Sequence, residues 1–262
     1  MWTVEKRRKA KIAAISCTHS PFTPPETHSW ILDQLANIPD LTHFGHLGDV
    51  FESSAASVHA HEDTHTLEDE YEHGASFLKS IREVLPNDCN RWINTGNHDD
   101  NILAKDPRRI PSSLRSLVDW RNHPEFGEEF QQWYWVPYEK SRKGVYKIGQ
   151  CLFYHGFDCS MNSDELEGLQ MMNCSSWLPH GLTVRGHTHR PVPPTQSMRT
   201  KKVPLPFWYA NVGTCGPLKP NYAKRKDTSL WGSAIIVVEC VWDRPSKLNG
   251  KCWEAELIRM NA

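Results

Sequence analysis

Short apolar runs recur along the chain, and most of them end in glycine, asparagine, aspartate or histidine. Runs of this length are typical of buried strands. They predict strands at 11–16, 43–50, 91–95, 144–148, 151–155, 182–185, 207–212, 233–241 and 253–258. Apolar residues at helical spacing predict helices at 28–36, within 51–85 and at 164–172. Strands that alternate with helices and carry polar residues at their ends indicate a layered α/β protein.

Residues 100–140 break this pattern, because they hold four prolines, many charges and the aromatic run Trp133-Tyr134-Trp135. We expect an insertion there that covers the edge of the sheet or the site. The aromatic run could stack on a nucleobase, but packing inside the insertion is the favoured hypothesis. Since 262 residues fit one large domain, we expect residues 1–262 to form a single domain.

Composition excludes some classes of protein. The 30 basic and 31 acidic residues nearly cancel, which gives no support for a dedicated duplex-binding protein. No apolar run approaches the ~20 residues of a membrane span. The basic start is followed by only a short apolar stretch, Ile12 to Ile15, so no export signal is predicted. The eight cysteines form no C-x-x-C pair, and we expect reduced thiols in the cytoplasm.

Five polar motifs follow predicted strands: Cys17-Thr18-His19, Gly48-Asp49, Gly96-Asn97-His98-Asp99, Tyr154-His155-Gly156 and Gly186-His187-Thr188-His189. Residues at i and i+2 of an extended segment point to one side, so each histidine pair or Cys-His pair can face one cavity. Imidazole, carboxylate and amide oxygen suit Zn, Fe, Mn or Co. Two such ions roughly 3.5–4 Å apart clamp a phosphoryl group and convert a bound water to hydroxide near neutral pH.

In order and spacing, these motifs resemble those of calcineurin-like metallophosphoesterases: D-x-H, G-D, G-N-H-D/E, H and G-H-x-H. The resemblance spans residues 17–189, about two thirds of the chain. Asn211-Val212-Gly213-Thr214 is also similar to the Asn-Pro-Gly-Ser turn that often follows in this family. The resemblance implies a four-layer α/β/β/α sandwich of two mixed β-sheets. It also implies a binuclear site for two transition metals, with Zn, Fe or Mn as candidates.

Position by position, the resemblance implies one metal site made of Cys17, His19, Asp49 and His189. The second shares Asp49 as a bridge and adds Asn97, His155 and His187. His98 corresponds to the family's general acid, and we expect Asp99 to orient it. Arg185 and Arg190 flank the last motif and could contact a substrate phosphate.

Cys17 departs from the family, which has aspartate at this position. A thiolate is a softer ligand that binds zinc through one atom at about 2.3 Å. We therefore expect Zn or Fe to be favoured over Mn or Mg. The alternative is that Cys17 is a small buried residue beside a weak or empty first site.

The leading functional hypothesis is a phosphodiesterase that uses a metal-bound hydroxide and His98. Val50-Phe51-Glu52 follows Asp49, whereas protein Ser/Thr phosphatases carry Asp-Arg-Gly there. The alternatives are a phosphomonoesterase or nucleotide phosphatase, and a metal-poor interaction module, which is disfavoured because only one ligand position is altered and His98 is present. The expected partner is a phosphoester, with nucleotides and nucleic acid among the candidates. The basic stretches 201–202 and 224–226 could contact phosphates, although solvated loops are the default interpretation.

Overall fold

The computed structural model describes residues 9–54, 65–103, 115–175, 180–197, 206–220, 227–241 and 251–260. The first of its two sheets has six strands in the order β11 (Trp253–Arg259), β10 (Ala234–Val241), β1 (Lys9–Ile15), β2 (His43–His46), β3 (Asn90–Asn94) and β4 (Tyr134–Val136). Strands β1 to β4 run parallel to one another, whereas β10 is antiparallel to both β1 and β11. The sheet is therefore mixed.

The second sheet has five strands in the order β5 (Tyr146–Ile148), β6 (Cys151–Phe153), β7 (Leu182–Arg185), β9 (Trp208–Asn211) and β8 (Val192–Gln196). Its inner strands β6, β7 and β9 are parallel, and both edge strands are antiparallel to their neighbours. Parallel strands of both sheets therefore end in loops that can meet at one rim.

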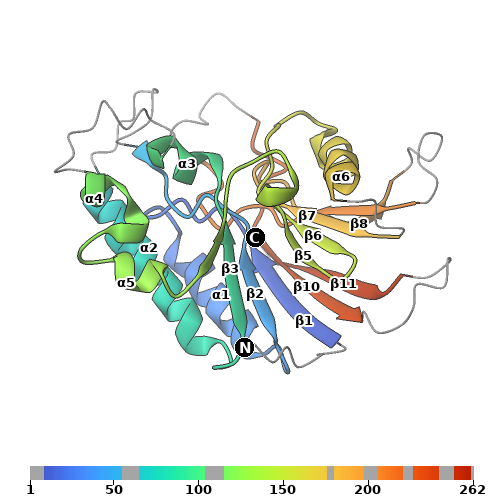
Figure 1. Cartoon of the computed structure of the whole chain (residues 1–262), viewed down its shortest axis with the longest axis horizontal. Helices are drawn as coiled ribbons and strands as arrows, with labels where there is room; N and C mark the ends of the chain where they lie inside the picture. Colours follow the sequence, from blue (N-terminus) through green and yellow to red (C-terminus); the bar gives the residue numbers. More distant parts are fainter. Residues whose placement is uncertain are drawn as a thin grey trace.

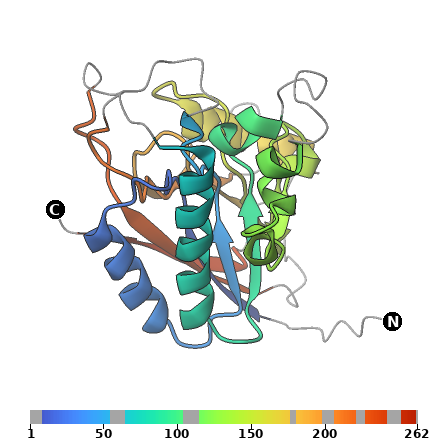
Figure 2. The same cartoon turned by 90° about the vertical axis from the view of Figure 1, so that its left-hand side faces the viewer.

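Three hydrophobic cores separate four layers. Helices α1 (Pro25–Ala36) and α2 (Leu67–Val84) cover one face of the six-stranded sheet, as Figures 1 and 2 show. The second core lies between the two sheets, and the third lies between the five-stranded sheet and α6 (Ser163–Cys174). The layers therefore run α/β/β/α, which confirms the architecture expected from the sequence.

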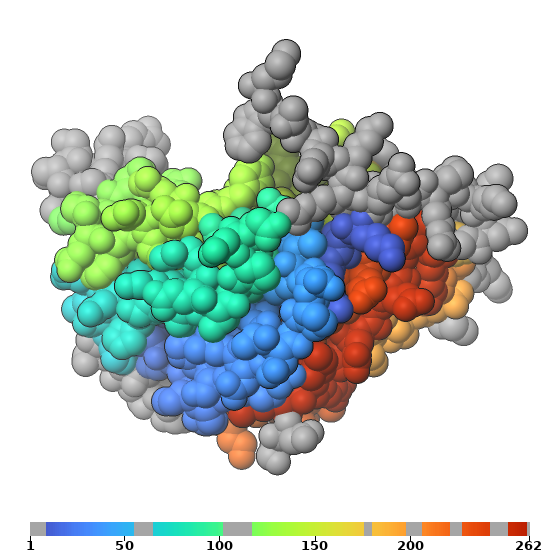
Figure 3. Space-filling model, turned by 90° about the horizontal axis from the view of Figure 1, so that it is seen from below, coloured from blue at the N-terminus to red at the C-terminus, as the bar shows by residue number. Residues whose placement is uncertain are grey.

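Strand β1 shows how one apolar run serves two cores. Ala13 and Ile15 face the helices, whereas Ile12 and Ala14 face the other sheet. Side chains alternate between the two faces of a strand, so a strand covered on both faces is apolar throughout. Strand β1 pairs with β2 on one side and with β10 on the other, and Figure 3 shows the blue N-terminal residues beside the red C-terminal ones.

That the whole chain is a single domain stays a prediction.

The segment predicted as an insertion covers the edge of the six-stranded sheet. Its described part holds α4 (Arg115–Val118), the 3-10 helix η4 (Trp120–Asn122), α5 (Gly127–Phe130) and the edge strand β4, while residues 104–114 lie outside the described ranges. Trp120, Phe130 and Trp133 are buried in the core beneath α2. Trp135 packs on Trp120 with ring centroids 3.7 Å apart, whereas Tyr134 points outward. The aromatic run is therefore mainly core packing.

Strands β4 and β8 were missed in the sequence, and several predicted elements are shorter than expected, β2 and α2 among them. Strand β8 contains Pro193 and Pro194, which lack N–H donors and are tolerated only at an edge. Strand β2 ends at His46, four residues earlier than predicted, and residues 47–50 belong to the loop that follows it. Helix α2 begins at Leu67 after a capping box, in which the backbone N–H of Thr66 donates to the Asp69 carboxylate at 2.8 Å and that of Asp69 donates to Thr66 Oγ1 at 3.1 Å.

None of the helices in the described ranges has the length and apolar character needed to cross a membrane.

Candidate metal centre

All five motifs lie in loops that leave the carboxyl ends of parallel strands. Cys17 and His19 follow β1, Asp49 follows β2, and His155 follows β6. Asn97 begins helix α3 (Asn97–Leu103) after β3, and the His187–His189 loop follows β7. The two sheets pack face to face with these ends at the same rim, so residues 170 positions apart come into contact.

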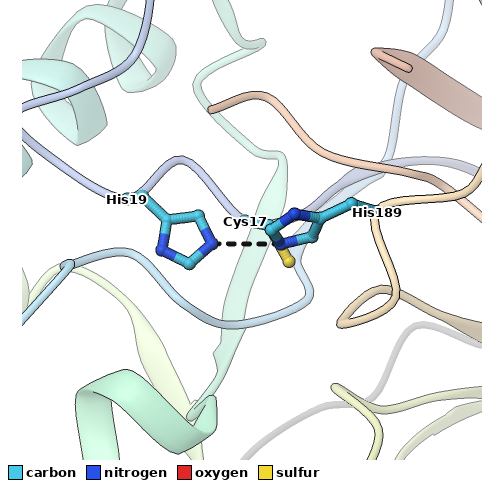
Figure 4. A group of neighbouring side chains, drawn as sticks. All are labelled: Cys17, His19 and His189. Atoms are coloured by element: carbon cyan, nitrogen blue, oxygen red, sulfur yellow. Dashed lines mark hydrogen bonds between the residues drawn. The ribbon is translucent and has the colours of Figure 1, made fainter. Parts of the chain in front are cut away.

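The first group of donor atoms joins the two sheets. His19 and His189 point at each other, with Nε2 atoms 3.1 Å apart (Figure 4). Their donor atoms and Cys17 Sγ all lie within 4.8 Å of one another. The backbone N–H of His187 donates to Cys17 Sγ at 3.3 Å. The structure therefore brings Cys17 to the place that the first motif predicts.

The second group surrounds the other side of Asp49. His155 Nε2 lies 3.1 Å from Asp49 Oδ2 and 3.1 Å from Asn97 Oδ1. His187 Nδ1 lies 3.2 Å from His155 Nε2. Asp49 Oδ2 is also 3.9 Å from His19 Nε2, so the carboxylate stands between the two groups. The structure thus assembles the other six predicted ligand positions around the Asp49 carboxylate.

The donor chemistry fits a cation. The Leu47 carbonyl oxygen lies 2.6 Å from His155 Nδ1 and places the proton on that nitrogen. The opposite nitrogen, Nε2, faces the Asp49 carboxylate oxygen at 3.1 Å and is the atom that a bound cation would use. His19 Nδ1 makes an ion-pair contact with Glu52 Oε2 at 2.7 Å, and its Nε2 is turned to the centre. Imidazoles positioned from behind by such groups, with their other nitrogens converging, are typical of metal ligands.

The protonation states agree with ligation. Burial lowers the pKa of His187 to about 3 and holds the pKa of His189 well below its usual range, so both rings are neutral. Burial alone would raise the pKa of Asp49, but His155, His98 and His19 outweigh it and hold that pKa well below normal. Burial and the charge of Asp49 raise the pKa of Cys17, so a nearby cation is needed to convert its thiol to thiolate.

Backbone conformation is strained at the same residues. Cys17, His19, Asp49, His187 and His189 have φ values of 57°, 50°, 55°, 68° and 60°. The left-handed region costs a residue with a side chain about 1–2 kcal/mol. Hydrogen bonds from Cys17 N to Gly48 O (2.9 Å) and from His19 N to Asp49 O (3.0 Å) hold these loops in place. Strain concentrated in this way marks functional sites.

His98 lies at the mouth of the centre, but Asp99 does not orient it. The His98 ring places Nδ1 2.6 Å from the Glu52 carbonyl oxygen, and its backbone N–H donates to Asp49 Oδ1 at 3.0 Å. Asp99 is fully buried and accepts from the backbone N–H of Asp49 (2.9 Å) and Gly96 (2.8 Å). Successive residues of α3 point about 100° apart, which separates the two side chains. The expected role of Asp99 is therefore corrected: it braces the Asp49 loop.

Burial and nearby negative charges together set the pKa values of His98 and Asp99. Burial lowers the pKa of His98, but the negative charges of Asp49 and Glu52 outweigh burial, so the net shift is upward. Burial and the charge of Asp49 raise the pKa of Asp99 to about 6. His98 is therefore protonated more readily than His187 or His189.

The two flanking arginines differ. Arg185 is 1% exposed, donates to Asp158 O at 2.8 Å and pairs with Glu167 at 2.9 Å, so the predicted phosphate contact is wrong for this residue. Arg190 lines a cavity of about 470 Å³ with His19, His98 and His187, and donates to Cys159 O at 3.2 Å. Arg190 alone remains a candidate for phosphate contact.

Asn211 was noticed in the sequence only as part of a turn, yet it ties the loops together. Its Nδ2 donates to Asp164 Oδ1 (2.8 Å), Gly186 O (2.9 Å) and Thr188 Oγ1 (2.8 Å). Thr214 in the same turn donates to Cys17 O at 2.9 Å.

Cys159 also lies at the site, with its Sγ 3.1 Å from His187 Nε2. It belongs to none of the five motifs, so the sequence did not indicate it.

Comparison with known proteins adds little to this geometry. The sequence matches no family model and no curated protein. Among solved structures the fold is similar to Vps29 of Chaetomium thermophilum, with 11% identity and a TM-score of 0.42 over 96% of this chain and 93% of that one. It is also similar to "a putative diadenosine tetraphosphatase", with 11% identity and a TM-score of 0.37 over 95% and 93% of the two chains. At these values neither similarity bears on function, which rests on the residues of the site.

Proposed function

We propose that this chain is a metal-dependent phosphoesterase of the calcineurin-like type. The observation that carries the proposal is the convergence of electron-pair donors from both sheets on the Asp49 carboxylate. A cation between these atoms would satisfy nitrogen, sulfur and oxygen donors that are otherwise crowded together in a buried pocket. Together with the five motifs, they support a centre for two transition metals.

The residues divide into two ligand sets that share Asp49. Cys17, His19 and His189 make up one set, and Asn97, His155 and His187 make up the other. Ions bound there would neutralise phosphate oxygens and lower the pKa of a water molecule. The thiol of Cys17 and the imidazoles favour Zn or Fe at the first position.

His98 is the proposed proton donor to the leaving oxygen. Its Nδ1 faces the Glu52 carbonyl oxygen, so Nε2 is the atom free to exchange a proton with a substrate. The charges of Asp49 and Glu52 raise its pKa against the effect of burial, which favours the protonated ring that an acid needs. Arg190 at the mouth supplies a positive charge for a phosphate oxygen.

The preferred substrate class is a phosphodiester, and the direct test is a ratio. The turnover of bis-(p-nitrophenyl) phosphate is divided by that of p-nitrophenyl phosphate, with Zn or Mn supplied. We expect a ratio well above one. A ratio well below one would indicate a monoesterase at the same centre. Purified protein that binds no metal and hydrolyses neither ester would instead support a non-catalytic interaction module.

A further inference from the structure

The cavity of the candidate metal centre adjoins a larger cavity of about 1010 Å³, here called the side groove. Four residues line both cavities: Met161, Arg190, Leu230 and Trp231. The side groove continues from there between the start of α1, residues 216–219 and residues 229–233. A substrate held at the centre would therefore have one substituent directed into an open, preformed space.

Apolar side chains are exposed in this groove. Six large hydrophobic side chains are exposed among the described residues, and three of them line the groove: Met161 (73%), Leu230 (58%) and Leu218 (38%). Each exposed apolar side chain forgoes the gain of burial. Exposed apolar side chains gathered in one concave place mark a binding surface rather than chance.

Trp231 is held at a fixed position relative to the metal centre. Its ring meets the His189 ring edge-on, with centroids 4.3 Å apart. The next residue, Gly232, donates its N–H to the His189 carbonyl oxygen at 3.1 Å, and Trp231 N–H donates to Thr228 O at 2.9 Å. The indole therefore packs directly on His189, a proposed metal ligand.

Polar and charged groups interrupt the apolar lining. Arg190 stands at the junction of the two cavities, and Glu26, Lys219, Ser229 and Arg259 lie further along the groove. An alkyl chain would leave these groups without partners and gain nothing from them. A flat ring joined to a hydroxyl-bearing sugar would use both kinds of lining, since aromatic rings stack on bases and polar side chains bond their edges.

We propose that the side groove binds the nucleoside of a nucleoside phosphodiester, with its base against Trp231 and its phosphate between Arg190 and the metal centre. The inference rests on the proposed phosphoesterase function and adds the substrate class. Met161, Leu218 and Leu230 supply the apolar contact, and the groove determines which ester substituent is accepted. It also makes Trp231 a specificity-determining residue.

The test compares three diesters that release the same p-nitrophenolate: the thymidine 5′-, methyl and octyl p-nitrophenyl phosphates. We expect kcat/KM to be highest for the thymidine ester. Trp231→Ala should lower the thymidine-to-methyl ratio of kcat/KM about tenfold, the size of one stacked base. Trp231→Phe should restore most of that ratio. Leu230→Ala should lower it less, and Tyr134→Ala, which removes an exposed aromatic ring on β4, should leave it unchanged.

Calorimetric titration with thymidine 5′-monophosphate provides a readout independent of turnover. Binding that is lost in Trp231→Ala and kept in Tyr134→Ala supports the groove even if no diester is hydrolysed, in which case only the phosphoesterase function has failed. An octyl ester that equals or exceeds the thymidine ester would overturn the nucleoside assignment. Equal kcat/KM for all three esters, with no titratable nucleotide binding, would overturn it as well.

Discussion

The metal centre and the side groove lie next to each other, yet they are built in opposite ways. The centre holds buried polar atoms on backbone in the left-handed region, as at His19 and Asp49, and secures them with hydrogen bonds. The groove exposes apolar side chains such as Met161 and Leu230, which belong to no motif. Catalysis at a metal requires particular donor atoms in a fixed geometry. Binding a flat aromatic ring requires mainly apolar surface. Motifs are therefore visible in the first region and not in the second.

Asp49→Ala should have the largest effect, because this carboxylate stands between both ligand sets. We expect metal content to fall and turnover of every ester to drop to background. The measurement is elemental analysis of purified protein beside turnover with Zn or Mn. Asp33→Ala on the exposed side of α1 is the matched control. Full activity in the Asp49 variant would rule out a shared bridging carboxylate.

His98→Ala should come next, with metal content retained and kcat lowered by about 10²–10⁴-fold, the usual worth of a general acid. The loss should grow as the leaving group becomes more basic, since p-nitrophenolate needs little protonation. A series of aryl and alkyl diesters measures this slope. His73→Ala, an exposed histidine of α2, is the control. A loss that is equal across the series would contradict the role of proton donor.

Arg185→Met tests the scaffold beneath the centre. It removes the buried cation that pairs with Glu167 and Asp164, so the free energy of unfolding should fall by about 3–5 kcal/mol. Denaturant unfolding measures this change. Arg190→Met at the cavity mouth is the matched comparison, and it should leave stability nearly unchanged while raising KM. If both variants kept full stability, the buried network would have no structural role.

Cys17→Asp should have the smallest effect on total activity and the clearest effect on metal choice. A carboxylate is a harder ligand than a thiolate, so the preference should move from Zn or Fe toward Mn. Turnover ratios with Mn and Zn, with bound metal measured in parallel, give the answer. An unchanged ratio would indicate that Cys17 is a packed small residue and no ligand.

The errors in the sequence-based predictions have structural causes. Leu182 and Val184 face the core between the sheets, so strand alternation turns Arg185 to the opposite face, toward α6. Asp164 and Glu167, spaced i, i+3 on that helix, were a signal that could have identified its partners. Asp99 looked like a partner of His98 because the two are adjacent. Because α3 begins at Asn97, the side chains of His98 and Asp99 point in different directions around the helix. No pattern in the sequence indicates that the helix begins there.

The sequence by itself determined most of the strands, the order of the motifs and the donor types, because apolar runs and ligand chemistry are local properties of the chain. It also indicated the four layers through the family resemblance. Only the tertiary structure decided that Cys17 and His189 share one pocket, that Glu52 rather than Asp99 supports His98, and that residues from six segments form the side groove. Contacts between distant segments depend on how the two sheets pack, and that packing is a property of the folded whole.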